Sequence, residues 1–225
     1  MDGEWHIRRE LVRYARRTYE RGYVAATDGN LSARLGAGRV LVTPSGCCLG
    51  EVEVASLVVV DLGGRPLSGR SKPTSELALH LKVYERRADV QAVVHAHPVY
   101  VNAFSFAGIE VDACAIPEAV VSLGRAPLTK YATPSSPEGA AVIQGLIEQH
   151  DALVLQRHGS LTVGRDIREA YMRLEKLEHA AHVSLLARQL GGVRPLSADE
   201  LRRLAEVSER YGWKTAEHVQ RQCAP

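Results

Sequence analysis

Two histidines and a carboxylate lie within one stretch of the sequence at a spacing that suits chemistry. Residues 93–97 read Val-Val-His-Ala-His, so one residue separates His95 from His97, and Glu76 lies upstream in the segment Lys-Pro-Thr-Ser-Glu-Leu. Side chains two residues apart leave the same face of a strand, with their Cα atoms about 6.5–7 Å apart. Two imidazoles on one face can bind one cation. The stretch therefore predicts a metal site.

A third histidine supplies a further candidate ligand. His158 ends an apolar run that begins at Ala152, and Gly159 follows it. This pattern predicts a buried strand whose end brings the imidazole toward the other two. Three neutral imidazoles leave one coordination position open, which is the pattern of catalytic rather than structural zinc sites. Imidazole ligands favour zinc or another divalent first-row ion.

The remaining histidines are weaker candidates. His80 lies one helical turn after Glu76 and is interpreted as an ordinary surface or core histidine. His179 and His182 are three residues apart on a predicted helix, as metal ligands can be, but no strong companion set accompanies them. We therefore expect these two to lie on the surface or at an interface.

Three polar turns predict a site for an oxyanion. Each turn offers backbone N–H groups and a short polar side chain, and the third also lies at the start of a predicted helix, where the helix dipole favours an anion. Singly, each turn is ordinary. Together with a metal site they predict a pocket for a phosphate group. The candidate residues are Asn30, Ser45, Gly46, Thr74 and Ser75.

Length and composition restrict the architecture and the partners. With 225 residues, 45% of them hydrophobic, the chain can bury a full core, and we expect one domain over residues 1–225. The formal net charge of +2 comes from 28 basic and 26 acidic residues. Such a mixture argues against nucleic acid or an anionic membrane as a partner. No apolar run approaches a membrane span and no signal-peptide pattern opens the chain, so we expect a cytoplasmic protein.

The cysteines show no spacing typical of a metal or redox motif. Cys47 and Cys48 are adjacent, which is poor geometry for a disulfide, and Cys114 and Cys223 stand alone. All four are predicted to be reduced.

Hydrophobic periodicity and turn signals predict mixed helices and strands without the strict alternation of a doubly wound fold, which favours a three-layer α/β arrangement. Predicted strands cover residues 31–35 and 39–43 as a hairpin, 56–61, 89–97, 109–113 and 152–159, with 161–163 continuing extended. Predicted helices cover 4–21, 74–84, 100–108, 116–123, 136–146, 166–190 and 197–211, the last opened by a capping box.

Six segments together resemble one known family, the class II aldolase/adducin family, in its fuculose-1-phosphate aldolase branch. The similarity runs in order across about residues 5–190. The segments are Gly-Asn-Leu-Ser-Ala-Arg at 29–34, Thr-Pro-Ser-Gly at 43–46, Lys-Pro-Thr-Ser-Glu at 72–76, Val-Val-His-Ala-His at 93–97, Tyr-Ala-Thr at 131–133 and Gln-Arg-His-Gly at 156–159.

The resemblance implies a fold, an assembly and a set of roles. The fold would be a three-layer α/β/α domain with a central, mainly antiparallel sheet, and the assembly a homotetramer with active sites between subunits. By matching position, Glu76 would be the catalytic acid and base. His95, His97 and His158 would hold zinc, and Asn30, Ser45, Gly46, Thr74 and Ser75 would bind the substrate phosphate.

The implied activity is reversible cleavage of a sugar 1-phosphate, such as L-fuculose 1-phosphate, to dihydroxyacetone phosphate and an aldehyde. A divalent ion can stabilise the enediolate that forms when the C–C bond breaks. A carboxylate near that carbon can move the proton, provided burial raises its pKa toward working pH. A bound phosphate anchors the reacting carbon.

The chain departs from the family's aldolases in one place. Those enzymes carry a catalytic tyrosine a few residues after Ile-Pro, supplied by a neighbouring subunit, whereas residues 116–121 here read Ile-Pro-Glu-Ala-Val-Val. Tyr131 and Tyr211 are possible substitutes. A metal-dependent decarboxylase or dehydratase of the same fold is the main alternative. The family's 4-epimerases are disfavoured because they carry aspartate where Glu76 stands, and an adducin-like interaction domain has no reason to keep the four site residues together.

Overall fold

A single seven-stranded sheet forms the centre of the computed structural model, which describes residues 2–212, 217, 219 and 223. The strand order is β4-β3-β2-β1-β5-β7-β6, and every neighbouring pair is antiparallel. The strands are β1 (Asn30–Gly36), β2 (Arg39–Val42), β3 (Val58–Asp61), β4 (Pro66–Ser68), β5 (Ala92–Ala96), β6 (Ala152–Leu155) and β7 (Gly159–Gly164).

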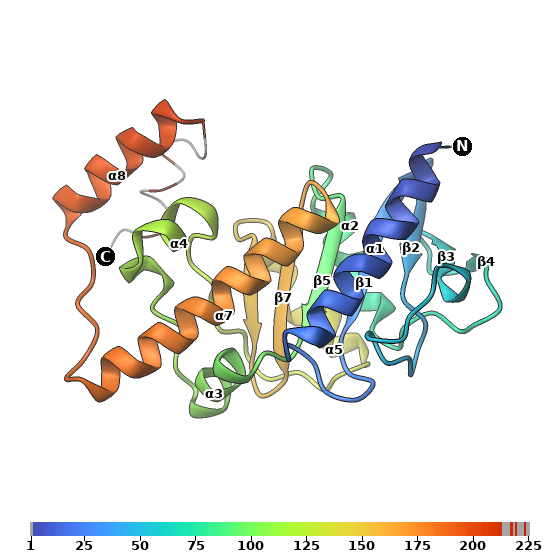
Figure 1. The fold of residues 1–225 in the computed structure, drawn as a ribbon, viewed down its shortest axis with the longest axis horizontal. Helices are drawn as coiled ribbons and strands as arrows, with labels where there is room; N and C mark the ends of the chain where they lie inside the picture. Colours follow the sequence, from blue (N-terminus) through green and yellow to red (C-terminus); the bar gives the residue numbers. More distant parts are fainter. Residues whose placement is uncertain (1, 213–216, 218, 220–222, 224–225) are drawn as a thin grey trace.

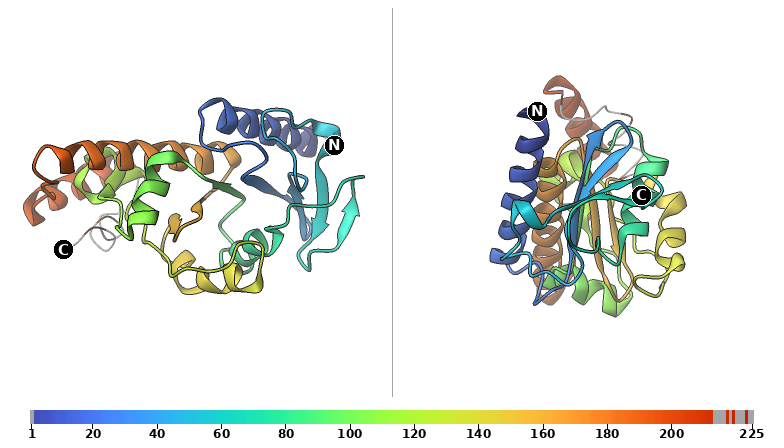
Figure 2. Two further views of the ribbon diagram at one scale, coloured as in Figure 1. Left: turned by 90° about the horizontal axis from the view of Figure 1, so that it is seen from below. Right: turned by 90° about the vertical axis from the view of Figure 1, so that its right-hand side faces the viewer.

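Helices cover both faces of this sheet (Figure 1). They are α1 (Asp2–Glu20), α2 (Leu77–Arg86), α3 (Val99–Ala107), α4 (Pro117–Ser122), α5 (Pro137–Val142), α6 (Gln144–Ile147), α7 (Ile167–Gln189) and α8 (Ala198–Arg210). The left view of Figure 2 shows α1 and α7 side by side on one face, with α2 and α5 on the other. The predicted three-layer α/β/α arrangement with an antiparallel sheet is therefore confirmed.

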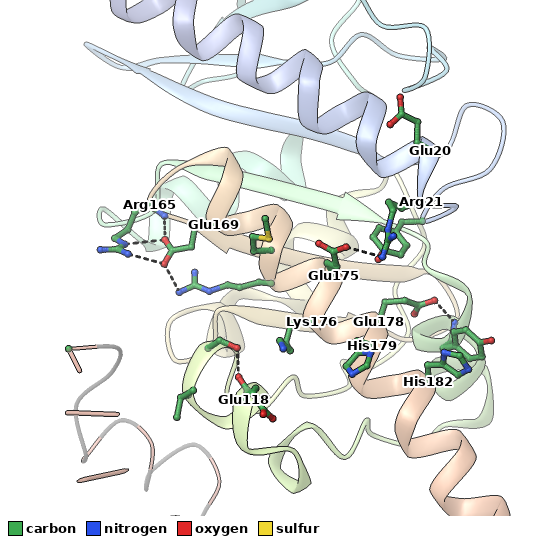
Figure 3. A pocket seen from close by; sticks show the side chains of 17 residues that line it. Glu20, Arg21, Glu118, Arg165, Glu169, Glu175, Lys176, Glu178, His179 and His182 are labelled. Atoms are coloured by element: carbon green, nitrogen blue, oxygen red, sulfur yellow. Dashed lines mark hydrogen bonds and ion pairs between the residues drawn. The ribbon is translucent and has the colours of Figure 1, made fainter. Parts of the chain in front are cut away.

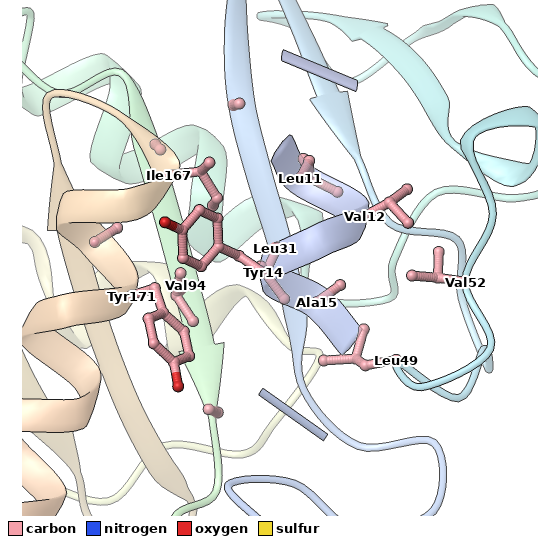
Figure 4. Close-up of a cluster of buried hydrophobic side chains, with 14 of the residues drawn as sticks. Leu11, Val12, Tyr14, Ala15, Leu31, Leu49, Val52, Val94, Ile167 and Tyr171 are labelled. Atoms are coloured by element: carbon pink, nitrogen blue, oxygen red, sulfur yellow. The ribbon is translucent and has the colours of Figure 1, made fainter. Parts of the chain in front are cut away.

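Two hydrophobic cores follow from the alternation of side chains along the strands. Val94 of β5 packs with Leu11 and Tyr14 of α1 and Tyr171 of α7, whereas its neighbour Val93 packs on the opposite face with α2 and α6. The Tyr14 and Tyr171 rings lie 5.2 Å apart in the first core (Figure 4). Both cores meet at β5, so this strand is buried on both sides and forms a rigid base for the residues at its end.

Three predicted elements were wrong. The strand predicted over 152–159 ends at Leu155, and residues 156–158 form the turn to β7. Residues 109–113 form no strand; instead, Gly108 ends α3 with φ +70° and a short 3₁₀ helix covers Ala113–Ala115. The alternating side chains Val111 and Ala113 bury against the helices beside them rather than pairing with another strand. The helix predicted over 136–146 is divided into α5 and α6 at Ile143. Strand β4 was not predicted, because three exposed edge residues carry no periodic signal.

The prediction that all four cysteines are reduced was wrong for two of them. Cys114 and Cys223 form a disulfide, with Cα atoms 5.4 Å apart, while Cys47 and Cys48 are free. The two bonded residues are 109 positions apart. A rule based on local spacing cannot detect this pair, because Val219 and Cys223 pack against residues of α4 and α8. None of the described helices is both long and apolar enough to cross a membrane.

Candidate active site

Three imidazoles converge at one end of the central strands. His95 is the fourth residue of β5, His97 follows the strand directly, and His158 lies in the turn between β6 and β7. The Nε2 atoms of His95 and His97 are 3.0 Å apart, and the three rings lie 4.7–5.0 Å from one another. The structure therefore brings together the three histidines that the sequence singled out.

Glu76 completes this cluster with a carboxylate. Its Oε2 atom lies 3.0 Å from His95 Nε2, and its Oε1 atom lies 3.3 Å from His158 Nε2. The candidate ligand atoms of all four residues lie within 4.8 Å of one another, and no other such group of His, Cys, Asp and Glu occurs among the described residues. Glu76 immediately precedes α2 rather than lying in its first turn, and Thr74 Oγ1 accepts its backbone N–H.

The register of the antiparallel strands fixes the position of each site residue along the sheet. Residue 95 of β5 lies opposite Asn30 of β1 on one side and Leu161 of β7 on the other. The β6–β7 turn then carries His158 back toward β5, and Arg157 enters it with φ +57° and donates its backbone N–H to Ser105 Oγ at 2.6 Å. Strand pairing, rather than the loop alone, therefore sets the position of the third imidazole.

Gly159 is required by the close approach of this turn to β5. A Cβ at this position would lie 2.5 Å from the Ala96 carbonyl oxygen and 2.6 Å from Cδ2 of the His97 ring. Both distances are far shorter than van der Waals contact. A side chain here must displace either the strand backbone or a candidate ligand.

Replacing Gly159 with alanine is therefore expected to weaken zinc binding by at least about tenfold, because His97 and His158 can no longer approach each other. Zinc titration of the purified protein, followed by calorimetry, measures the effect. Gly145→Ala is the matched control, since a Cβ there meets nothing within 4 Å. Equal zinc affinity in the Gly159 variant and in this control would contradict the expectation.

Hydrogen bonds around the cluster turn the imidazoles toward its centre. His95 Nδ1 lies 2.9 Å from the carbonyl oxygen of Ser160, which can only accept, so Nδ1 carries a proton and Nε2 faces the cluster. His97 Nδ1 lies 3.5 Å from Asp28 Oδ2. Sequence analysis did not select Asp28, although it stands in the same turn as Asn30.

This donor set fits a divalent first-row ion. With Zn–N distances of about 2.0–2.1 Å, two nitrogens on a tetrahedral ion are separated by about 3.3 Å. The 3.0 Å between His95 and His97 is close to that value without rearrangement of the strands. Three imidazole nitrogens plus one carboxylate are ligand types that zinc accepts.

Burial and neighbouring charge set the protonation of the cluster. Burial, together with the nearby His95, lowers the pKa of both His97 and His158 to about 4. Both rings are therefore neutral near pH 7 and have lone pairs to donate. Burial favours a raised pKa for Glu76, but the opposing contacts with His95, His158 and Asn30 outweigh it and hold the pKa below its usual value. The expected rise toward working pH is thus not found, and Glu76 is a carboxylate at rest.

The polar turns gather at the same end of the sheet. Pro44 and Pro73 form an isolated bridge, Ser45 N–H donates to the Lys72 carbonyl at 2.9 Å, and Thr74 N–H donates to the Thr43 carbonyl at 3.1 Å. The turns at 45–46 and 74–75 therefore lie beside each other. Within the described part of the chain, the amides of Gly46 and Ser75 have no hydrogen-bond partner and can serve an anion.

Asn30 is placed differently from the other members of the predicted phosphate set. Its side chain is buried, and its amide nitrogen donates to Glu76 Oε2 at 3.0 Å. Its amide oxygen lies 2.6 Å from His80 Nε2. The structure thus connects the Asn30 side chain to the carboxylate, a contact that the sequence did not predict.

A narrow cavity beside Glu76 and His158 includes residues that sequence analysis did not select. Lys130, Ser135 and Gln156 line it, and Ser135 donates a hydrogen bond to Ser75 at 3.1 Å. Gln156 belongs to one segment of the family resemblance, and Lys130 and Ser135 lie within two residues of another, but none was assigned a role. Tyr131 and Tyr211, the possible proton donors, are exposed, and neither lines this cavity.

A second, wider cavity lies elsewhere, along α7 (Figure 3). Its volume is about 1220 Å³, and both His179 and His182 line it. Several of its polar side chains have partners: Arg21 pairs with Glu175 at 3.0 Å, and Glu178 accepts the backbone N–H groups at the start of α3. His182 stacks on Tyr100 at 3.8 Å. The only group of candidate metal ligands among the described residues is the histidine cluster, which is therefore the candidate active site.

Comparison with known proteins places these features in a wider group. The family model for the Class II Aldolase and Adducin N-terminal domain matches residues 9–185. The chain is 37% identical over 172 residues to an L-fuculose phosphate aldolase of Methanococcus maripaludis (strain C7), covering 76% of this chain and 92% of that one. It is 32% identical over 211 residues to a 3-oxo-tetronate 4-phosphate decarboxylase of Pectobacterium atrosepticum, covering 91% and 95%.

Solved structures agree with these sequence matches. YgbL from Klebsiella pneumoniae superposes with a TM-score of 0.82 at 35% identity, covering 89% of this chain and 98% of that one. An L-fuculose 1-phosphate aldolase superposes with a TM-score of 0.84 at 26% identity, covering 92% and 96%. Both solved structures therefore share most of this chain's fold.

Proposed function

The chain belongs to the class II aldolase and adducin family, and we propose that it is a metal-dependent lyase that breaks a C–C bond in a phosphorylated sugar or sugar acid. The convergence of three imidazoles and one carboxylate carries this proposal. We assign His95, His97 and His158 to the metal and Glu76 to proton transfer. A bound divalent ion would polarise the substrate carbonyl and stabilise the charge of the enediolate.

The two activities named for the relatives share one half-reaction. Cleavage of L-fuculose 1-phosphate between C3 and C4, and loss of carbon dioxide from 3-oxo-tetronate 4-phosphate, both leave the enediolate of dihydroxyacetone phosphate. Glu76 would exchange the proton at the enediolate carbon in either case. The free amides of Gly46 and Ser75, with nearby hydroxyl groups, would bind the phosphate and fix that carbon in place. The remaining difference lies in the group that leaves.

We propose aldol cleavage of a sugar 1-phosphate, releasing dihydroxyacetone phosphate and an aldehyde, as the first candidate. In this reaction the C4 hydroxyl gives its proton to a base or to water, and the C3–C4 electron pair passes to the enediolate. Glu76 then takes up a proton from water and delivers it to C3. In the reverse direction an ionised carboxylate must take that proton from dihydroxyacetone phosphate. The lowered pKa of Glu76 suits this reverse step.

Decarboxylation is the second candidate, and the residues that would face the departing group favour it. No tyrosine occurs in α4, so the base that aldol cleavage needs at the C4 hydroxyl is missing there. Carbon dioxide leaves without any proton transfer. Lys130 also lines the cavity beside Glu76 and His158, where its ammonium group offers a cation to a substrate carboxylate.

A homotetramer with active sites between subunits also forms part of the proposal. Val99 and Phe106 of α3 are 65% and 63% exposed, close to the end of β5 that carries the histidines. A second copy that covers this apolar surface would also lie near the open side of the site. Sedimentation of the purified protein would give a mass about four times that of the chain.

Deuterium exchange tests the shared half-reaction before the leaving group is known. The zinc-loaded protein is incubated with dihydroxyacetone phosphate alone in D₂O, and NMR follows loss of one carbon-bound hydrogen. We expect stereospecific exchange of that hydrogen. Absence of exchange in fully folded, zinc-loaded protein would overturn the proposed lyase activity.

Product analysis then separates the two candidates. Condensation of dihydroxyacetone phosphate with members of an aldehyde panel supports the aldolase. Release of carbon dioxide and dihydroxyacetone phosphate from 3-oxo-tetronate 4-phosphate, without condensation, supports the decarboxylase. Exchange without either product would reject both named substrates while retaining the enediolate chemistry.

A further inference from the structure

A continuous chain of side-chain hydrogen bonds runs from Glu76 into the core. Asn30 Nδ2 donates to Glu76 Oε2 at 3.0 Å, and Asn30 Oδ1 lies 2.6 Å from His80 Nε2. The other ring nitrogen, His80 Nδ1, lies 2.6 Å from Ser32 Oγ, which lies 2.8 Å from Tyr84 Oη. Asn30, Ser32, His80 and Tyr84 are all at most 5% exposed. The chain therefore has its only partly exposed end at the candidate active site.

Two regular elements build this chain by their periodicities. Asn30 and Ser32 are two apart on β1 and share one face, while His80 and Tyr84 are one turn apart on α2 and share another. The next residue on that face of β1, Arg34, places its guanidinium over the Tyr84 ring at 4.6 Å. The side chains thus alternate between strand and helix as far as the Arg34 contact.

The chemistry of the end groups fixes the direction of each hydrogen bond. An ionised Glu76 can only accept, so the Asn30 amide turns its nitrogen toward it and its oxygen toward His80. That oxygen also only accepts, so His80 Nε2 carries a proton. Burial lowers the pKa of His80 to about 3, so the ring is neutral and Nδ1 accepts from the Ser32 hydroxyl. Ser32 Oγ in turn accepts from Tyr84, whose pKa burial raises.

We propose that His80 is a positioning residue for the reaction: through Asn30, and supported by Ser32 and Tyr84, it holds the Glu76 carboxylate in place over the reacting carbon. Every donor in the chain points toward Glu76, so rotation of the Asn30 amide would break bonds at both of its ends. The inference rests on the proposed role of Glu76 in proton transfer. His80 touches neither the candidate metal ligands nor substrate, and it acts only through Asn30.

Burial without function does not account for this arrangement. His80 lies on the buried side of α2, where Leu79 and Val83 belong to the apolar core. A leucine there would bury apolar surface without the desolvation cost of an imidazole. Hydrogen bonds at both ring nitrogens offset that cost, and the chain they belong to ends at Glu76. The imidazole therefore transmits a fixed orientation rather than simply filling space.

The tautomer of His80 can be tested without any activity. Long-range ¹H–¹⁵N NMR on the zinc-loaded protein at pH 7 distinguishes the two neutral tautomers from the imidazolium ion. We expect the neutral form with hydrogen on Nε2. Hydrogen on Nδ1, or a charged ring, would overturn the proposal even if the protein proved to have no lyase activity.

A double-mutant cycle tests the positioning role itself. His80→Leu is expected to slow deuterium exchange into dihydroxyacetone phosphate at saturation by about 10–100-fold, with KM and zinc content little changed, because Glu76 is displaced rather than removed. In an Asn30→Ala background the same substitution should cost less than about twofold, since its only route to Glu76 is gone. Independent, multiplying effects of the two substitutions would overturn the proposal.

Two further variants separate positioning from lost stability. Val83→Ala shortens a buried side chain on the same helix that takes no part in the hydrogen-bond chain. It should therefore lower the melting temperature but leave deuterium exchange unchanged. Tyr84→Phe keeps the ring and removes only the terminal donor, so it should fold even if His80→Leu does not. We expect a milder loss of about two- to fivefold, suppressed in the Asn30→Ala background. If neither Tyr84→Phe nor His80→Leu slowed deuterium exchange, the hydrogen-bond chain would be rejected as a positioning device.

Discussion

Glu76→Gln is expected to keep the bound metal and to reduce turnover by about 10²–10⁴-fold. Glutamine has the same shape, and its amide oxygen can still accept the Asn30 N–H that now lies 3.0 Å from Glu76 Oε2. The amide cannot take or give the proton at the reacting carbon. Deuterium exchange into dihydroxyacetone phosphate measures the loss, and metal analysis of the same sample checks that the site is intact.

Two comparisons make the Glu76 result specific. Glu76→Asp keeps a carboxylate but withdraws it by one methylene, so exchange should fall less than in Glu76→Gln. Retained exchange in Glu76→Gln would remove this residue from proton transfer. Loss of metal together with exchange would instead assign it to the metal, which its contacts with both His95 and His158 allow.

His95→Ala is expected to abolish metal binding, whereas the wild-type protein should hold about one divalent ion per chain. His95 is fully buried and central to the cluster, since its Nε2 atom contacts both Glu76 and His97. Its removal leaves two imidazoles on separate segments. Plasma mass spectrometry of dialysed protein measures the metal, and the zinc-dependent rise in melting temperature should disappear with it.

His182→Ala is the matched control for the metal experiment. Its imidazole stacks on Tyr100 beside the large cavity along α7, away from the cluster, so the variant should retain the metal. A wild-type protein that stays metal-free and fully folded after incubation with zinc would rule out the proposed site.

Asn30 was assigned to the phosphate, but its side chain contacts Glu76. Both roles are compatible only if the side chain contacts Glu76 and the backbone binds the phosphate. The side chain is engaged at both ends, by Glu76 and His80. Any contribution to the phosphate must come from the turn that Asn30 shares with Gly29, where φ is +74°. A role can be assigned to a residue because its position matches a family motif. The structure is then needed to show which atoms of that residue are available for the role.

Much of the fold could be predicted from local patterns. Spacing of three and four placed α1, the Ser197 and Glu200 capping box placed the start of α8, and glycine turns placed the β1–β2 hairpin. The His95 and His97 pair was readable because strand geometry sends alternate side chains to one side. Each of these signals depends on a few neighbouring residues, so the sequence alone determines it.

Contacts between distant segments were decided only by the tertiary structure. Strand order brings His158 to His95, and the pairing of β1 with β5 and the position of α2 bring Asn30 and His80 to Glu76. The Cys114–Cys223 disulfide likewise joins residues 109 positions apart. Periodicity predicts which face of a helix or strand a side chain occupies, but not which other segment packs against that face. The sequence therefore determined the candidate metal ligands and the carboxylate, and packing of the sheet and α2 decided how that carboxylate is held.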